Sequence, residues 1–267
     1  WSAQLPVFAA THQVVTIDLA GHGDSGVNRE NWSMANFGAD VAAVADALQL
    51  EDIILVGHSM GGPVALEAAR LLKGRVKMVI GADTFSNIID WDRRDAVFFG
   101  DGAGAILLKA TEENRGFVGF DMNTDGSGRD GFTVPAGGSE RPASKETLAQ
   151  GLHCFQMDGP AVYKTAVKAV PKSIGTLLEK TGISIGDITC MLPHQPSIKI
   201  LEEIARRVGL PWDKVKTNMD RYANTSGGTI PIVLDEAWRS NEFNPGDHLL
   251  FAAVGAGWTW GTALYKM

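Results

Sequence analysis

Three polar side chains lie in segments whose composition is typical of exposed turns and active-site loops rather than of a packed core. His194 and Asn224 lie in short stretches rich in Pro, Gly, Ser and Thr, and Ser59 lies between glycines. An imidazole N–H and an amide N–H can together bind a carbonyl oxygen, and a serine hydroxyl can attack a carbonyl when a base activates it. These residue types therefore indicate chemistry at an ester or thioester carbonyl.

Ser59 belongs to the pentapeptide Gly57-His58-Ser59-Met60-Gly61, which fits the pattern G-x-S-x-G. The β-branched residues 53–56 predict a strand before it, and residues 63–72 predict a helix after it. A tight strand-to-helix turn exposes the serine Oγ, while the helix N-terminus offers N–H groups to an oxyanion. We therefore expect a nucleophile elbow, with Ser59 as nucleophile and Met60 at the oxyanion site. A glycine-rich turn with an incidental serine is the alternative.

His194 follows the predicted buried strand 188–192 and opens a loop before a helix. In an α/β sheet this is the usual place for a group that faces a ligand crevice. Asn224 stands in an Asn-Thr-Ser-Gly-Gly turn, where its amide can point outward. Two N–H donors could stabilise the enolate that a malonyl thioester forms when it loses CO₂. A structural histidine and a turn-forming asparagine are the alternatives.

Other candidate motifs are weaker. The run Gly100-Asp-Gly-Ala-Gly-Ala imitates a dinucleotide-binding pattern, but a strand-like apolar stretch follows it where a helix is needed. Cys154 and Cys190 have no metal-type spacing. Cys190 lies inside a predicted strand, and no predicted helix N-terminus activates Cys154. We therefore expect no metal ion and no bound cofactor.

The elements that position these residues alternate between strands and helices. Strands at 14–18, 53–56 and 76–80, with helices at 34–48 and 63–72, predict a parallel β-α-β-α-β segment. Residues 124–141 are rich in Gly, Asp and Ser and predict a long surface loop. The remaining patterns predict strands at 117–120, 188–192, 248–254 and 260–265, and helices at 159–180, 197–208 and 229–239. The fold class is α/β, with a mixed sheet and covering helices in the second part.

Composition excludes several classes of protein. The 267 residues are 45% hydrophobic and 21% charged, which excludes a disordered or collagenous chain. The net charge is −7, which argues against a nucleic-acid binder. No apolar run reaches the roughly 20 residues of a membrane-spanning helix, so we expect no membrane partner. With only two cysteines and no signal peptide in view, we expect a cytoplasmic protein.

Residues 1 to about 85 resemble the α/β-hydrolase family. The resemblance is carried by the elbow around Ser59 and by the run Asp18-Leu-Ala-Gly-His-Gly-Asp-Ser25 upstream of it. It covers a nucleophile without the acid and histidine of a catalytic triad. His22 and His58 belong to backbone motifs of that family and are not its catalytic base.

From about residue 81 onward the chain resembles the C-terminal half of β-ketoacyl-acyl carrier protein synthase III, a thiolase-fold condensing enzyme of fatty acid biosynthesis. Five segments carry this resemblance in one order: Gly81–Ser86, Phe99–Ala105, Pro193–Pro196, Tyr222–Ser226 and Gly255–Gly261. By this resemblance His194 and Asn224 are the catalytic pair. Gly255, Ala256 and Gly257 line the site and supply an oxyanion N–H, and Gly159 and Tyr163 line the substrate channel. The implied substrates are acyl-CoA and acyl carrier protein thioesters, and a homodimer is possible.

The chain therefore reads as a chimera of a hydrolase-like segment, 1–85, and a thiolase-like half, 86–267. A condensing enzyme of this type carries a nucleophilic cysteine on an elbow, and here Ser59 stands in that place, with His194 as the expected base. The leading hypothesis is an acyltransferase of the synthase III kind. The alternatives are a serine ester or thioester hydrolase acting through Ser59, and a folded chain without catalytic activity.

Overall fold

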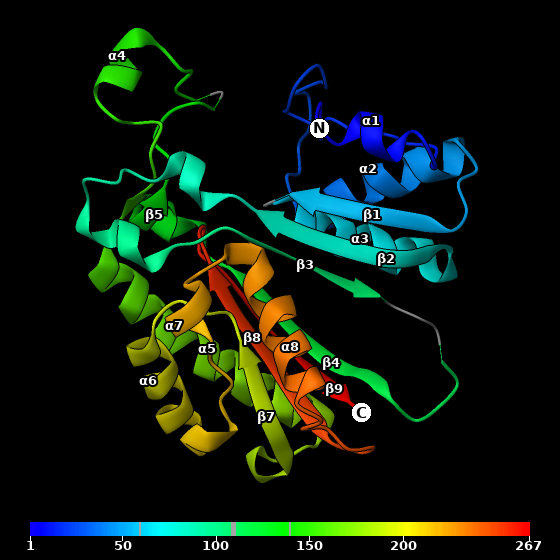
Figure 1. The fold of residues 1–267 in the computed structure, drawn as a ribbon, viewed down its shortest axis with the longest axis vertical. Coiled ribbons are helices and arrows are strands. Elements are labelled where there is room, and N and C mark those ends of the chain that lie inside the picture. Colours follow the sequence, from blue (N-terminus) through cyan, green and yellow to red (C-terminus); the bar gives the residue numbers. More distant parts are fainter. Residues whose placement is uncertain (59, 108–110, 139) are drawn as a thin grey trace. The chain divides into compact units, whose positions relative to one another are not determined.

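The computed structural model describes residues 1–58, 60–107, 111–138 and 140–267 (Figure 1). These residues form two compact units. The first unit comprises residues 1–80, and the second begins at Gly81. Leu107, although it comes later in the chain, belongs to the first unit. Each unit has a hydrophobic core of its own.

Two helices and the strands beside them form the core of the first unit. Its elements, in chain order, are α1 (Leu5–Phe8), α2 (Met34–Ala47), β1 (Ile53–His58), α3 (Gly61–Leu72), a 3₁₀ turn (Lys73–Arg75) and β2 (Val76–Asp83). Ser33 caps α2 by accepting a hydrogen bond from the backbone N–H of Asn36. Helices α2 and α3 approach closely at Gly38, where a Cβ would lie 2.5 Å from Cβ of Glu67. Small residues at this contact let the two helices pack together.

The predicted strand at residues 14–18 is wrong. These residues form no regular element, and Val15 is 37% exposed. A β-branched run favours a strand only where another strand can satisfy its backbone N–H and C=O groups. The predicted β-α-β-α-β segment is therefore reduced to β1, α3 and β2, preceded by α2. Strands β1 and β2 run in the same direction, as predicted (Figure 1).

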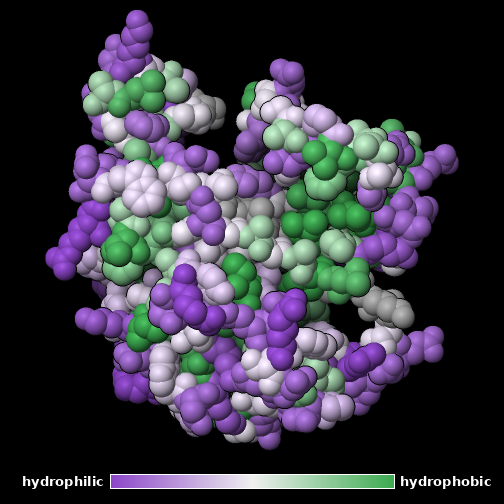
Figure 2. All heavy atoms as spheres, in the orientation of Figure 1, coloured by the Kyte–Doolittle hydropathy of each residue, from purple (hydrophilic) through white to green (hydrophobic). Residues whose placement is uncertain are grey.

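β1 is an exposed edge strand. Among the described strands it pairs with β2 alone, and the next strand along the chain is β3 (Gly102–Leu107). Ile54 and Val56 on β1 are 43% and 41% exposed, and Figure 2 shows hydrophobic side chains gathered on this part of the surface. An apolar edge of this kind favours pairing with another chain. The expected homodimer stays a prediction.

A four-stranded mixed sheet forms the centre of the second unit. Its order is β4-β9-β8-β7, comprising β4 (Gly116–Thr124), β9 (Thr259–Lys266), β8 (His248–Gly255) and β7 (Ile188–Pro193). β7 and β8 are parallel, whereas β9 is antiparallel to both of its neighbours. These strands confirm the elements predicted from the apolar runs, and they place the end of β7 beside β8.

Helices cover both faces of this sheet. Helices α5 (Gly159–Thr181) and α6 (Ile198–Val208) pack on one face, against side chains such as Met191, Leu250 and Leu264. Helix α8 (Thr229–Arg239) packs on the other face, against Cys190 and Leu249. Alternate residues of one strand point to opposite faces, so both faces of β8 are apolar. The mixed sheet with covering helices was predicted from the sequence.

Shorter elements complete the second unit. They are α4 (Lys145–Ala149), α7 (Met219–Tyr222) and a two-stranded antiparallel sheet of β5 (Phe132–Thr133) and β6 (Gln156–Met157). The 3₁₀ turns lie at Phe85–Ile88, Arg94–Phe98, Gly126–Gly131, Ile185–Asp187, Trp212–Lys214 and Ser226–Gly228. The region predicted as one surface loop, 124–141, thus contains a 3₁₀ turn and β5. Among the helices of the described residues, none is long and apolar enough to cross a membrane.

Candidate active site

His194 stands at the carboxyl end of two parallel strands. It follows β7 directly, and its backbone N–H donates to the carbonyl of Ala252 on β8 at 2.8 Å. The paired residues Pro193 and Ala252 end the β7–β8 ladder. In open α/β sheets this end of the strands is where ligands bind. The structure thus places His194 directly after β7 and before α6, as the sequence predicted, and its catalytic role stays a prediction.

The imidazole of His194 is held through Nδ1. Nδ1 lies 2.8 Å from Oγ1 of Thr229, the first residue of α8. The same hydroxyl lies 2.8 Å from the carbonyl oxygen of Ser226. Because the hydroxyl carries one proton, it can donate to the carbonyl or to Nδ1, but not to both. When it donates to Nδ1, the ring proton is on Nε2, which then becomes an N–H donor.

His194 is neutral near pH 7. Burial lowers the pKa of its imidazole to about 4, although the backbone of Ser226 favours the protonated form. A neutral imidazole has one N–H donor and one acceptor nitrogen. It can therefore donate a hydrogen bond or accept a proton, depending on its tautomer.

Asn224 is fixed by its backbone and by one side-chain atom. Its N–H donates to the carbonyl of Phe98, and its carbonyl accepts from the N–H of Gly100, both at 2.9 Å. Its side-chain Oδ1 accepts from the N–H of Ser226 at 2.9 Å. Among the described residues, none accepts a hydrogen bond from Nδ2 of Asn224. Since Oδ1 is engaged, the NH₂ group is the part of this amide that remains for a ligand.

Glycines at three alternate positions, 100, 102 and 104, let the segment that leads into β3 pack closely against the turn that contains Asn224 and the helix that follows it. A Cβ on Gly100 would lie 2.7 Å from the carbonyl of Tyr222, and one on Gly102 would lie 2.7 Å from Cβ of Thr225. A Cβ on Gly104 would lie 2.1 Å from Cβ of Pro231. The Gly-Asp-Gly-Ala-Gly motif, which imitates a dinucleotide-binding loop, therefore serves close packing beside Asn224.

The loop that contains Gly255, Ala256 and Gly257 is the turn between β8 and β9. Gly255 pairs with Thr259, and Gly257 has a φ of 132°, which a residue with a Cβ rarely adopts. Trp258 is 6% exposed, and its backbone exchanges two hydrogen bonds with Asp125. The turn thus starts three residues beyond Ala252, the partner of His194, and is held in place.

The other predicted site residues lie on other elements or are not described, and their roles stay predictions. Gly159 and Tyr163 are in the first turns of α5, where Tyr163 is 41% exposed and lies within electrostatic reach of Arg206 on α6. Met60 directly precedes α3 in the first unit. Ser59 lies outside the described residues, so its pairing with His194 stays a prediction.

Gly57, at the end of β1, lies close to the backbone of the first residues of α3. A Cβ on Gly57 would lie 2.2 Å from the carbonyl oxygen of Gly61 and 2.5 Å from the backbone nitrogen of Gly62. Only glycine fits at that position. The end of β1 and the start of α3 therefore approach closely at Gly57.

The two cysteines differ in burial. Burial raises the pKa of the Cys190 thiol to about 12, which keeps it protonated and unreactive. Cys154 is a half-buried free thiol. Within the described ranges, no group of three or more His, Cys, Asp or Glu side chains could hold a metal ion.

Sequence reasoning missed the residues that hold the candidate pair. Thr229 was assigned only to a helix, although it stands five residues after Asn224. Gln195 directly follows His194 and is 1% exposed, which is unusual for its type. A buried glutamine beside a candidate catalytic residue is a usable signal, because its amide must be satisfied by hydrogen bonds.

Two family models match the chain. The model described as 3-oxoacyl-[acyl-carrier-protein] synthase III C terminal matches residues 178–267. The model described as alpha/beta hydrolase fold matches residues 1–159. The two matched segments do not overlap, and they fall in the order that the sequence motifs predicted.

Among its relatives, the chain is similar to β-ketoacyl-[acyl-carrier-protein] synthase III from Desulfitobacterium hafniense. The two are 44% identical over 190 residues, which cover 71% of this chain and 57% of the relative. The chain therefore spans little more than half the length of that relative. With the enzyme of the same name from Caldanaerobacter subterraneus it shares 40% identity over 233 residues, covering 87% of this chain and 69% of the relative. That similarity must extend into the first 80 residues.

Solved structures give the same assignment. The 3-oxoacyl-(acyl carrier protein) synthase III from Pseudomonas aeruginosa has a TM-score of 0.67 at 27% identity, covering 87% of this chain and 82% of that one. The synthase III from Thermus thermophilus has a TM-score of 0.67 at 28% identity, covering 90% and 86%. The fold, the order of the motifs and these similarities agree: the chain belongs to the β-ketoacyl-[acyl-carrier-protein] synthase III family, with a first part that an α/β-hydrolase model also matches.

Proposed function

We propose that this chain is an acyltransferase of the synthase III type, which acts on a malonyl thioester of acyl carrier protein and on an acyl-CoA. One observation carries the proposal: the short segment from Ser226 to Thr229 contacts both candidate residues. Thr229 contacts the imidazole of the neutral His194, and Ser226 donates to the side-chain oxygen of Asn224, which leaves the NH₂ group of Asn224 for a ligand. The names of the relatives support the choice of substrates. The substrates are themselves thioesters, and the proposed chemistry needs no further cofactor.

The proposed step is loss of CO₂ from the malonyl group. The thioester carbonyl oxygen accepts hydrogen bonds from Nδ2 of Asn224 and from Nε2–H of His194. When the carbon–carbon bond to the carboxylate breaks, CO₂ leaves, the electron pair of the bond forms an enolate, and the negative charge on oxygen is stabilised by the two donors. The enolate carbon then takes a proton from water to give the acetyl thioester. The Nε2–H tautomer requires Nδ1 to accept a hydrogen bond, so in this tautomer the Thr229 hydroxyl turns from the carbonyl of Ser226 and donates to Nδ1.

Acyl transfer needs a nucleophile as well. By its place in the sequence this is Ser59, where the family has a cysteine. A serine hydroxyl is far less acidic than a thiol, and a helix N-terminus contributes at most about 2 kcal/mol to the stabilisation of a charge. We therefore propose that decarboxylation of the malonyl thioester is faster than condensation.

Product analysis tests this proposal. The protein is incubated with acetyl-CoA and malonyl-acyl carrier protein, and the carrier protein is analysed by mass spectrometry. We expect acetyl-acyl carrier protein from decarboxylation, with little acetoacetyl product. Unchanged malonyl-acyl carrier protein from a folded sample would contradict the proposal and favour a chain without catalytic activity.

A serine hydrolase is the second candidate function. It is supported by the close approach of β1 and α3 at Gly57 and by the α/β-hydrolase match over residues 1–159. A fluorophosphonate reagent labels activated serines, so it distinguishes this candidate from the first. An adduct on Ser59, with release of free acid from a small ester or thioester, would favour the hydrolase. A folded sample without adduct would remove it.

A further inference from the structure

The two donors of the candidate site come from different loops of the second unit. His194 follows β7, whereas Asn224 follows α7, a helix of only four residues. Two groups that act on one oxygen atom must be placed to within about 0.5 Å. A four-residue helix is too short to be stable alone, because helix nucleation is unfavourable. Contacts with other elements must therefore set the position of α7 and of the turn after it.

The first of these contacts comes from Gln195. Its Nε2 donates to the carbonyls of Pro193 at 2.9 Å and Lys216 at 3.2 Å, and its Oε1 accepts from the N–H of Asn218 at 3.1 Å. Its side chain thus joins the end of β7, next to His194, to the residue that precedes α7. The amide is buried, and three hydrogen bonds satisfy it.

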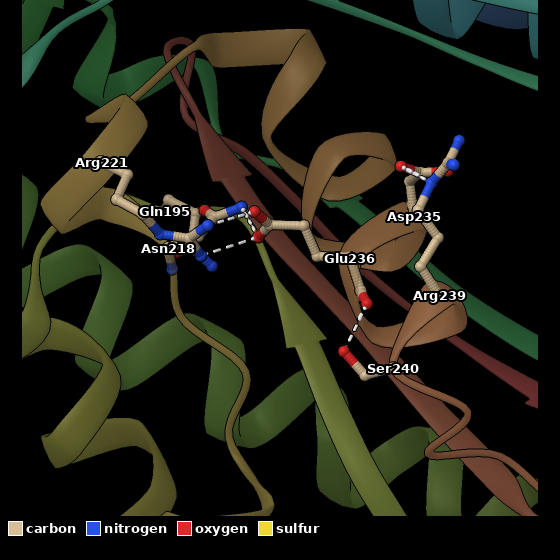
Figure 3. Close-up of polar contacts among 7 residues, drawn as sticks. All are labelled: Gln195, Asn218, Arg221, Asp235, Glu236, Arg239 and Ser240. Carbon is tan, nitrogen blue, oxygen red and sulfur yellow. Dashed lines mark hydrogen bonds and ion pairs between the residues drawn. The ribbon is translucent and has the colours of Figure 1, made fainter.

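The second contact is a single carboxylate, that of Glu236. Figure 3 shows Asn218 and Arg221 pointing at Glu236 on α8. Nδ2 of Asn218 donates to Oε2 at 2.8 Å, and the Arg221 guanidinium donates to Oε1 at 2.6 Å and to Oε2 at 3.1 Å. Asn218 precedes α7 and Arg221 lies within it. Glu236 therefore holds this short helix at two points.

Helix α8 connects this carboxylate to His194. Thr229, which contacts the imidazole, and Glu236 are seven residues apart on α8. Residues with this spacing share one face of a helix and are about 10 Å apart along its axis. One face of one helix thus contacts His194 at its first turn and holds α7 two turns later. Burial opposes ionisation of Glu236, but the bonds from Asn218 and Arg221 outweigh it and keep the pKa of the carboxyl below its usual value.

We propose that Glu236 is a positioning residue: by holding α7 against α8 it sets, together with the backbone hydrogen bonds of Asn224 to Phe98 and Gly100, the place of Asn224 relative to His194. It does not touch the substrate. The catalytic consequence of this inference rests on the proposed function, whereas the structural part does not. Removing the negative charge should let α7 and the Asn224 turn move, while His194 keeps its contact with Thr229.

Glu236→Gln tests the proposal, because it keeps the shape of the side chain. The control is Asp235→Asn on the same helix, whose carboxylate pairs with Arg239 at the surface (Figure 3). In Glu236→Gln we expect kcat for malonyl-thioester decarboxylation to fall about tenfold, with KM changed less than twofold. Asp235→Asn should match the wild type. In an Asn224→Ala background, Glu236→Gln should cause no further loss, because the group that it positions is absent.

Hydrogen exchange gives a readout that does not depend on activity. The backbone N–H groups of Arg221, Tyr222 and Ala223 donate within α7. Their exchange should be at least tenfold faster in Glu236→Gln and unchanged in Asp235→Asn. If the wild type shows no decarboxylation, the proposed function fails, and this exchange still decides the positioning role. If Glu236→Gln does not fold, Arg221→Gln removes one of the two ties and should give a smaller effect of the same kind. Turnover and exchange equal to the Asp235→Asn control would overturn the proposal.

Discussion

The imidazole Nδ1 of His194 and the hydroxyl Oγ1 of Thr229 lie 2.8 Å apart, although 35 positions separate them in the chain. The contact joins the end of β7 to the start of α8. Because the hydroxyl can donate to Nδ1 or to the carbonyl of Ser226, its orientation and the histidine tautomer depend on one another. Thr229 therefore decides whether Nε2 is a donor or an acceptor.

Replacing Thr229 by Val should lower decarboxylation. The variant keeps the shape of the side chain but removes the hydroxyl that can donate to Nδ1, so we expect kcat to fall roughly tenfold or more, equivalent to about 1.4 kcal/mol, with KM little changed. The ¹⁵N shifts of the imidazole should move toward the Nδ1–H tautomer. Thr229→Ser, which restores a hydroxyl, should recover most of the activity.

Thr225 offers a matched control for this variant. It is also 2% exposed, but its Oγ1 has no hydrogen-bond partner among the described residues. An unpaired buried hydroxyl stabilises nothing, so Thr225→Val should leave the melting temperature unchanged or raise it slightly. Equal losses of kcat in Thr229→Val and Thr225→Val would contradict the role given to Thr229.

The stability of the fold should depend on the titration of His194. Its pKa is about 4 in the folded state and close to 6.5 in the unfolded chain. Between these values the unfolded chain binds more protons, so stability falls as the pH is lowered from about 6.5 to about 4, by up to roughly 3 kcal/mol. Urea unfolding at a series of pH values, for the wild type and His194→Gln, measures the difference. If both proteins lose stability equally in this window, His194 is not the group responsible.

A methyl group at Gly102 should destabilise the second unit. The added Cβ would lie 2.7 Å from Cβ of Thr225, and overpacking of this kind costs about 1–3 kcal/mol. The opposite result is expected for Gly175→Ala in α5, where nothing lies within 4 Å of the new Cβ and Ala is the better helix former by about 1 kcal/mol. Chemical denaturation of both variants checks the two signs. Equal and small effects would show that β3 does not need its glycines.

Much of the second unit could be predicted from the sequence, because its long elements have clear periodicity. The apolar spacing in α5 and α6 and the buried runs of β7 and β8 are signals that a chain carries locally. The predicted strand at residues 14–18 failed because strand formation depends on a neighbour, which no local pattern reveals. Helix α7 was missed because four residues contain too little periodicity.

The site itself was predicted only in part. His194 and Asn224 were proposed from their residue types, their places in the predicted order and the resemblance of the chain to a family. Thr229, Gln195 and Glu236 were not, because a hydrogen bond between distant residues leaves no spacing rule in the sequence. The glycines at 100, 102 and 104 were noticed as a motif, but their reason is the close approach of another segment.

Ser59→Cys should allow the protein to form an acyl-enzyme. A thiol with a pKa near 8.5 forms a nucleophilic thiolate far more readily than a serine hydroxyl ionises. Incubation with acetyl-CoA should then add an acetyl mass to residue 59, which intact-protein and peptide mass spectrometry would detect. The wild type should add little. Condensation of acetyl-CoA with malonyl-acyl carrier protein by the wild type at about 1 per second or faster would contradict this account and make Cys154 the first candidate nucleophile.

The central claim is that His194 and Asn224 stabilise one developing oxyanion, and decarboxylation of malonyl-acyl carrier protein by His194→Ala and Asn224→Ala tests it most directly. Each variant removes one donor, which is worth about 3–4 kcal/mol, so each should lose at least about a hundredfold in rate. Circular dichroism should show that both variants remain folded. Decarboxylation at the wild-type rate in both folded variants would contradict the claim.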